Sequence, residues 1–408
     1  MSVNVSAEGP SNSARFNSAS RRAYRARAII AASAVALASM SVSASAQAQP
    51  LRPAARTVNG CVLQPQTTCI NATLTAQQFG PDELWSSDFR GTNFTSSTMT
   101  GTNFIRANLP DVSMVLTQHQ GTEFREANLT SANFNTATLD GAGLLAAIAP
   151  RSTYIEASLL RVGGLGADFT GADFSRASLV NSRFERAKFA GANFTSALIS
   201  RVTMLSAEAS QASFAKARID DGSNFTAANL LGANLSEAQI TNSTFDEAVL
   251  TTGNLTGAQL VNSSFIEAEL AGASLRAVQG TEVEFVNADL TAADFTLANF
   301  SLKNEDRLRR NDFSRANLTG ADFELADLRG AWFAGANLQR ADFTGAMLDG
   351  TVFYGADLRG AKIPGYNFDA KGRPKFSCDR NTKRDGLLRE RLKGHCRGWH
   401  TTIYLQAK

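Results

Sequence analysis

The chain has 408 residues, of which 19% are charged and 43% are hydrophobic, a balance that excludes an acidic disordered chain and an integral membrane protein. Three His and four Cys provide little material for metal or nucleophile chemistry, whereas 26 Phe against 5 Tyr and 3 Trp indicate aromatic bulk without polar tips. The net charge of +3 hides basic ends and an acidic body. Residues 1–60 carry seven Arg and one Glu, residues 61–368 carry 22 basic and 32 acidic residues, and residues 369–408 carry 11 and 4.

Residues 1–48 resemble a bacterial secretory signal peptide. A weakly apolar stretch of small residues, 28–48, follows a segment with five Arg and ends in the small-x-small sequence Ala46-Gln47-Ala48. The stretch is too rich in Ala and Ser for a good membrane span, and no transmembrane segment is expected after its removal. We therefore expect a mature chain that starts at Gln49 with a net charge of −1. Because of the pair Arg21-Arg22, the twin-arginine and general secretory routes both stay open.

The four cysteines flank the central part of the chain in two pairs. Cys61 and Cys69 are eight residues apart, and Cys378 and Cys396 are eighteen apart. In an oxidising compartment, two local disulfides that tie down the two ends are the simplest account. The alternative is a metal site made of Cys378, His395, Cys396 and His400. It lacks the closely spaced Cys pairs that are typical of zinc sites. We favour the disulfides and expect no metal and no cofactor.

A five-residue repeat runs through most of the chain. Phe or Leu recurs at every fifth position, a small residue stands two positions before it, and Asp or Asn often lies between them, as in GADFELADLRGAWFAGANLQRADFTGAMLDG. The frame covers 74–219, restarts one residue late over 225–300 and restarts again over 308–368. A helix would scatter these positions around its axis, and a straight strand would alternate their faces. The repeat therefore predicts short extended segments joined by corners.

Like residues recur every twenty positions, as in the series Phe225, Phe245, Phe265 and Phe285, which indicates four repeats per turn. The A-[D/N]-[L/F]-x-x unit resembles the pentapeptide-repeat family. The resemblance implies an all-β fold, a right-handed quadrilateral parallel β-helix (a β-solenoid), over residues 74–368. We expect Phe, Leu and Ala to fill a narrow core and the Asp and Asn side chains to bond the backbone at the corners. Residues 49–73 and 369–408 are expected to be short non-repeat caps.

Some positions depart from the repeat. Where Phe or Leu belongs, the chain has His119, Gly164 and Gly280. At His119 we expect a locally disturbed coil with a hydrogen-bonded or solvent-facing imidazole. At the two glycines we expect weak or bulged coils. An insertion after Phe300 is either a solvated bulge or a functional loop. Its candidate partner-binding residues are Arg307, Arg309 and Arg310.

The C-terminal segment allows two interpretations. Its apolar residues would cover the open end of the solenoid, and its excess of seven positive charges would meet an acidic surface, a polyanion or phospholipid headgroups. The residues expected to pack are Leu387, Leu388, Leu392 and Trp399. The candidate partner-binding residues are Arg380, Lys383, Arg384, Arg389 and Arg391.

Binding without catalysis is the favoured function, because no motif for nucleophilic, metal or phosphate chemistry appears in the sequence. We expect a scaffold exported to the periplasm or the cell exterior, or to the thylakoid lumen of a cyanobacterium. Its partner would be a protein or an envelope component and not a nucleic acid, and two copies joined end to end are also considered. An ice- or polysaccharide-binding face is opposed by breaks in its Thr row. The main alternative is a DNA mimic that inhibits or protects a type II topoisomerase, as some family members do. The signal peptide and the near-neutral mature charge oppose it.

Overall fold

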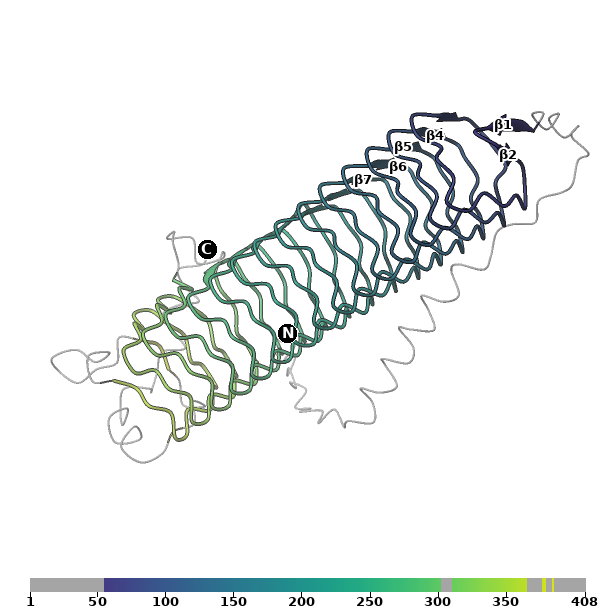
Figure 1. Cartoon of the computed structure of the whole chain (residues 1–408). Coiled ribbons are helices and arrows are strands. Elements are labelled where there is room, and N and C mark those ends of the chain that lie inside the picture. The colour runs from purple at the N-terminus through teal and green to yellow at the C-terminus, as the bar shows by residue number, and fades with distance from the viewer. Residues whose placement is uncertain (1–54, 302–309, 365–375, 379–383, 385–408) are drawn as a thin grey trace, which may run out of the picture. The chain divides into compact units, whose positions relative to one another are not determined.

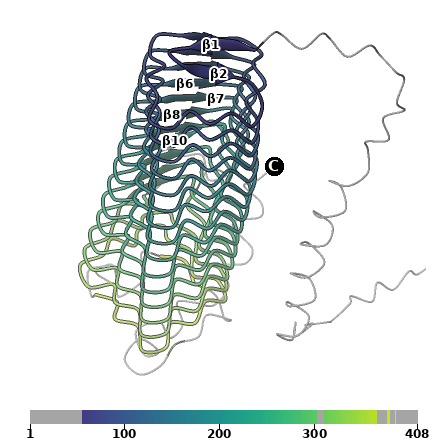
Figure 2. The same ribbon diagram turned by 45° about the vertical axis from the view of Figure 1, so that its right-hand side comes forward.

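The computed structural model describes residues 55–301, 310–364, 376–378 and 384. These residues form a solenoid of stacked coils, which Figures 1 and 2 show from two sides. The described part contains short strands and no helix, so it holds no helix long and apolar enough to cross a membrane. The strands are β1 (Arg56–Val58), β2 (Cys61–Leu63), β3 (Gln78–Phe79), β4 (Thr98–Thr100), β5 (Gln118–Gln120), β6 (Thr138–Asp140), β7 (Ser158–Leu160), β8 (Ser178–Val180), β9 (Leu198–Ser200), β10 (Arg218–Asp220), β11 (Gln239–Thr241), β12 (Gln259–Val261) and β13 (Gln279–Thr281).

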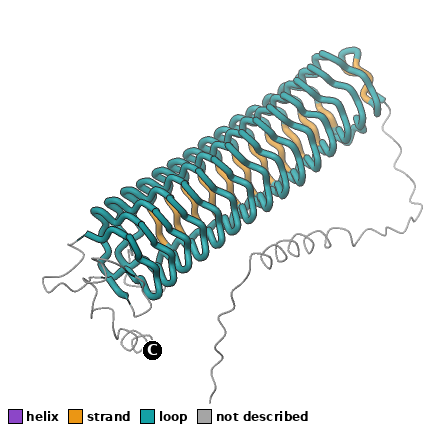
Figure 3. Tube along the Cα trace, turned by 90° about the horizontal axis from the view of Figure 1, so that it is seen from below, coloured by secondary structure: helices purple, strands orange, loops and turns teal. Residues whose placement is uncertain are grey.

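Strands β3 to β13 form one parallel eleven-stranded sheet in chain order. Successive strands pair residues twenty apart, such as Met99 with His119, except that β10 and β11 pair residues 21 apart. Each turn therefore holds four repeats. In Figure 3 the strands lie along one face of the solenoid, here called the strand face. Isolated parallel bridges connect the coils on the other faces. The expected all-β parallel solenoid with four repeats per turn is therefore confirmed.

The core follows the five-residue pattern. The central Phe or Leu of each repeat and the small residue two positions earlier are both buried, whereas the residue between them faces outward. Phe rings stack in columns along the solenoid; the ring centroid of Phe194 lies 4.9 Å from that of Phe174 and 4.8 Å from that of Phe214. Because the residues two positions before the rings are small, the rings have room to stack inside a narrow core. The expected core is confirmed.

The corners need a backbone conformation that the sequence pattern did not reveal. With the exception of Pro81, the second residue after a central position has a positive φ throughout the described repeats, for example 57° at Arg186, 52° at Asn181 and 65° at Gly191. The preceding Asp or Asn stabilises the corner, since Asn193 Oδ1 accepts a hydrogen bond from the backbone N–H of Thr195 at 3.0 Å. This Asx bond recurs in repeat after repeat and confirms the predicted role of Asp and Asn.

Both frame restarts leave the stack intact. The extra residue lies in the corner Asp221-Gly222, after which Phe225 returns to the core. At the second restart, Glu284 pairs directly with Asp312 across the insertion. Asn311 stabilises the coils on both sides of the insertion. Its buried side chain donates hydrogen bonds to the carbonyls of Gly280 and Phe300 and accepts one from the backbone N–H of Val283.

The sequence predicted weak or bulged coils at the two inward glycines, and the prediction of a bulge is wrong. Gly164 and Gly280 lie in regular coils, and Gly280 is part of β13. A Cβ atom on Gly164 would lie 2.5 Å from the ring of Phe184, one coil further on, and a Cβ on Gly280 would overlap the ring of Phe300. Each glycine therefore makes room for an aromatic ring of the next coil.

Candidate functional site

The N-terminal end of the core is covered by the antiparallel hairpin β1–β2. Its turn, Asn59-Gly60, has φ values of 46° and 81°, which suit the two-residue turn that this dipeptide favours. Arg56 forms an ion pair with Asp82 at 3.1 Å, and its guanidinium lies 5.2 Å from the ring centroid of Phe79. The hairpin thus joins the first coils through charge and aromatic contacts.

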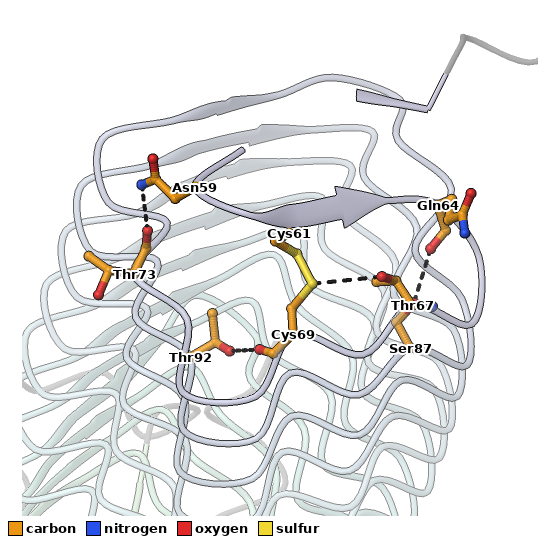
Figure 4. Close-up of a disulfide and its surroundings, with 8 residues drawn as sticks. All are labelled: Asn59, Cys61, Gln64, Thr67, Cys69, Thr73, Ser87 and Thr92. Carbon is orange, nitrogen blue, oxygen red and sulfur yellow. Dashed lines mark hydrogen bonds between the residues drawn. A yellow bond between two sulfur atoms is a disulfide. The ribbon is translucent and has the colours of Figure 1, made fainter. Parts of the chain in front are cut away.

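The predicted disulfide between Cys61 and Cys69 is present and buried beneath this hairpin (Figure 4). The hydroxyl of Thr92, from the next coil, donates to the carbonyl of Cys69 at 2.5 Å, and Asn59 Nδ2 donates to the carbonyl of Thr73 at 2.8 Å. These contacts tie the N-terminal segment to the open end of the first coils. The disulfide therefore acts at this end as a structural tie.

At the other end, a short segment packs on the last coil. Ser377 pairs with Val352, and the buried ring of Phe376 meets that of Phe353 edge to face, with 5.4 Å between their centroids. Cys378 is buried and disulfide-bonded, so its sulfur is not a thiolate for the alternative metal site. Its predicted partner, Cys396, lies outside the described residues. Sequence analysis did not select Phe376, because this residue stands outside the five-residue period.

Most of the predicted partner-binding residues cannot be placed. Those outside the described residues are Arg307, Arg309, Arg380, Lys383, Arg389 and Arg391, and the apolar residues expected to pack, Leu387, Leu388, Leu392 and Trp399, are outside them too. Arg384 is half-buried. The guanidinium of Arg310 lies over the ring of Trp332, 3.8 Å from its centroid, and the Trp332 ring meets that of Tyr354 edge to face. Of the predicted partner-binding residues, the structure therefore describes Arg310 and Arg384 alone, and the joint binding site stays a prediction.

His119 lies in the core, in the regular strand β5, and not in a disturbed coil. Its imidazole is hydrogen-bonded, as one of the two expected alternatives stated, with Thr117 Oγ1 2.9 Å from Nε2 and Thr122 Oγ1 3.3 Å from Nδ1. Burial lowers the pKa of His119 to about 3, so the ring is neutral at neutral pH. Phe124 and Phe134 pack against it. A neutral ring enclosed by hydroxyls and Phe fills the core and has no access to a substrate.

Many Arg and Lys side chains on the surface form ion pairs within the solenoid. Arg329 contacts Asp327, and Arg359 contacts Asp357 in the same way, each at 2.6 Å. Burial alone would raise the pKa of the Asp327 carboxyl, but the hydrogen bonds and charge of Arg329 hold it below its ordinary value. Among the residues that the structure describes, no group of three or more His, Cys, Asp or Glu could hold a metal ion.

The geometry defines a repeat protein of the parallel β-solenoid class, with four five-residue repeats per coil. The family model for pentapeptide repeats matches eight times, at residues 84–115, 117–144, 167–204, 221–257, 245–279, 258–296, 307–330 and 326–363. Since these matches cover more than half of the chain, the protein belongs to the pentapeptide-repeat family.

Several solved structures are similar to this chain. QnrB1, a plasmid-mediated fluoroquinolone resistance protein, is 21% identical over 53% of this chain and 95% of its own, with a TM-score of 0.30. HetL, which is involved in heterocyst differentiation regulation in the cyanobacterium Nostoc sp. strain PCC 7120, is 22% identical over 71% of this chain and 90% of its own, with a TM-score of 0.19. A thylakoid lumen protein of Arabidopsis thaliana is 32% identical over 26% of this chain and 64% of its own, with a TM-score of 0.16. A comparison with curated proteins gives no match.

Proposed function

We propose that this protein is an exported, non-enzymatic scaffold that binds a protein partner through the sides of its solenoid. The observation that carries the proposal is that both ends of the described core are covered, by β1–β2 at one end and by Phe376 and Cys378 at the other. The rows of outward side chains along the coils are therefore the surface offered to a partner. Repeat proteins commonly use such extended surfaces for binding.

The buried groups support the absence of catalysis. His119 is enclosed in the core and neutral, and Tyr154 is buried with its pKa raised by burial, so neither side chain is available for proton transfer to a substrate. Cys61, Cys69 and Cys378 are in disulfides, which removes their thiolates as nucleophiles.

The disulfides support export, because such bonds persist in oxidising compartments and are rare in the cytosol. The test is to fractionate cells that express the full chain and to sequence the mature N-terminus. An exported fraction that begins near Gln49 is expected. A chain found only in the cytosol with its first 48 residues intact would contradict the proposal.

A topoisomerase-directed DNA mimic stays the second candidate, favoured by one observation. Residues 221–301 carry ten Asp and Glu but a single basic residue, Arg276, which concentrates negative charge on neighbouring coils. A supercoiling assay with a bacterial type II topoisomerase tests it. Inhibition or protection at stoichiometric concentration, lost when Asp246, Glu247 and Glu267 are changed to Asn or Gln, would favour the mimic over the scaffold.

A further inference from the structure

One longitudinal row of outward side chains combines exposed apolar residues with charge of both signs. The row lies on the face that follows the strand face in the chain, and the bridges Gly163↔Arg183, Arg183↔Thr203, Thr203↔Asn224 and Asn224↔Thr244 give the order of its coils. On these coils we call two rows together the docking edge. The outward row holds Arg125, Leu145, Leu165, Glu185, Leu205, Thr226, Asp246, Ile266, Val286 and Ser314, and the corner row consists of the residue that follows each of them, from Glu126 to Arg315. On it, Leu145 and Leu165 are 40% and 44% exposed, far more than a core residue.

The docking edge is complementary to itself when it is reversed about the midpoint between the coils of Thr203 and Asn224. Counted outward from that midpoint, the coil of Leu165 corresponds to that of Ile266, and the coil of Leu145 to that of Val286. The same reversal sets the exposed Leu165 and Leu145 against the half-buried Ile266 and Val286, an apolar side chain against an apolar one at both levels. A two-fold axis across the solenoid brings each row onto itself in reverse order, which is the geometry of an isologous contact.

The corner row repeats this relation with charges. At equal distance from the midpoint lie Arg186 and Glu247, and further out Glu126 and Arg315. All four side chains are exposed. For Arg186, Glu247 and Arg315, no ion pair occurs within the part of the chain that the structure describes, whereas Glu126 pairs with Arg106. Reversal therefore places a cation opposite an anion at two levels on each side of the axis.

One pair of like charges also falls opposite, Glu185 and Asp246, but both carboxylates are held by their own solenoid. Glu185 pairs with Arg183 at 2.9 Å, and Asp246 accepts hydrogen bonds from the Ser264 hydroxyl and the Ile266 backbone N–H. The ion pair with Arg183 offsets the charge of Glu185 and so reduces the repulsion across the contact, whereas Asp246 keeps its full charge.

We propose that two copies of this chain associate side by side and antiparallel through the docking edge. The contact spans about ten coils at about 4.8 Å each, but it is only two rows of side chains wide. We therefore expect it to bury at most about 1,200 Å² in total, which is the lower end of specific interfaces. The dimer is therefore expected to be weak, with a dissociation constant in the micromolar range, and to weaken further with added salt.

The test is sedimentation velocity of the full chain over a series of concentrations, at low and high salt. The wild type is expected to dimerise, Arg186→Glu to weaken the dimer at least tenfold, and the double variant Arg186→Glu/Glu247→Arg to restore it, because the two-fold axis places the exchanged charges opposite each other again. Arg151→Glu, an exposed Arg on a neighbouring edge, is the matched control and should leave the dimer unchanged.

Three results would overturn the proposal. The first is a wild type that is monomeric at every concentration. The second is a dimer that Arg186→Glu does not weaken, which is the result expected of an end-to-end contact. The third is a double variant whose dimer is as weak as that of the single variant. Circular dichroism of each variant verifies the fold, and if Arg186→Glu fails to fold, Glu247→Arg provides the same single reversal.

Discussion

Phe194 illustrates how the solenoid depends on its inward side chains. It is fully buried and stacks between two other Phe rings, whereas its neighbour Thr195 lies partly exposed on the outside. Phe194→Ala should lower the free energy of unfolding by about 3–5 kcal/mol, because it removes buried area and leaves a cavity. Thr195→Ala should change it by less than ~0.5 kcal/mol. Urea unfolding measures both, and equal losses would contradict the inward assignment.

Gly164 tests the complementarity between neighbouring coils. Gly164→Ala should destabilise by about 1–3 kcal/mol, because the added Cβ meets the ring of Phe184 in a packed core. In the double variant Gly164→Ala/Phe184→Leu the collision is removed, so the two changes should cost less together than the sum of the single changes. Thermal unfolding of the four proteins of this cycle gives the interaction energy. Strict additivity would show that the glycine does not make room for the ring.

His119 should make stability depend on pH. Below pH 6.5 the unfolded chain binds a proton at this ring, whereas the folded chain, with its pKa of about 3, does not. The contribution to stability is therefore complete above pH 6.5 and is lost as the pH falls toward 3, by about 1.4 kcal/mol per pH unit. At pH 5 the loss should be about 2 kcal/mol. His119→Phe, which restores the residue type of the repeat, should remove this part of the slope; an unchanged slope would rule out the His119 contribution.

At the scale of elements, the two caps differ from the repeat in how they are held. The hairpin β1–β2 is held to the first coils by an ion pair and a hydrogen bond, and the Cys61–Cys69 disulfide is its covalent tie. Changing both cysteines to Ser should cost about 2–4 kcal/mol, because the unfolded chain gains the freedom that the short loop denied it. Hydrogen exchange should increase in β1 and β2 and stay unchanged at β9. Faster exchange throughout the solenoid would mean that the cap controls the whole fold.

The repeat made the coils predictable, because a period of five with like residues at twenty fixes both the inward positions and the number of repeats per turn. The caps were only partly predictable. Cysteine spacing indicated Cys61–Cys69, whereas Phe376 stands outside any period. The roles of Gly164 and Asn311 depend on contacts with residues twenty or more positions away. Such contacts require knowing which side chain lies on the adjacent coil, and a single position in the sequence does not contain that information.

At the scale of the whole molecule, charge is unevenly spread between an acidic body and a basic C-terminal segment. If that segment binds an acidic partner, neutralising Arg380, Lys383, Arg384, Arg389 and Arg391 with Gln should keep the fold and abolish binding that already weakens with salt. If it serves only as a cap, the neutralised variant should bind as the wild type does, whereas deletion of residues 369–408 should cause aggregation through the exposed end of the core.

The two variants separate these roles because the charges and the packing groups are different residues. Phe376 and Cys378 contact the last coil and are untouched by the neutralisation. The measurement is a pulldown from envelope extract with the wild type and both variants, at two salt concentrations, after circular dichroism has shown β structure in each bait. Recovery of the same proteins by the neutralised variant would eliminate electrostatic docking through the tail. Their loss from the neutralised variant while it stays folded would assign the partner site to these five cations.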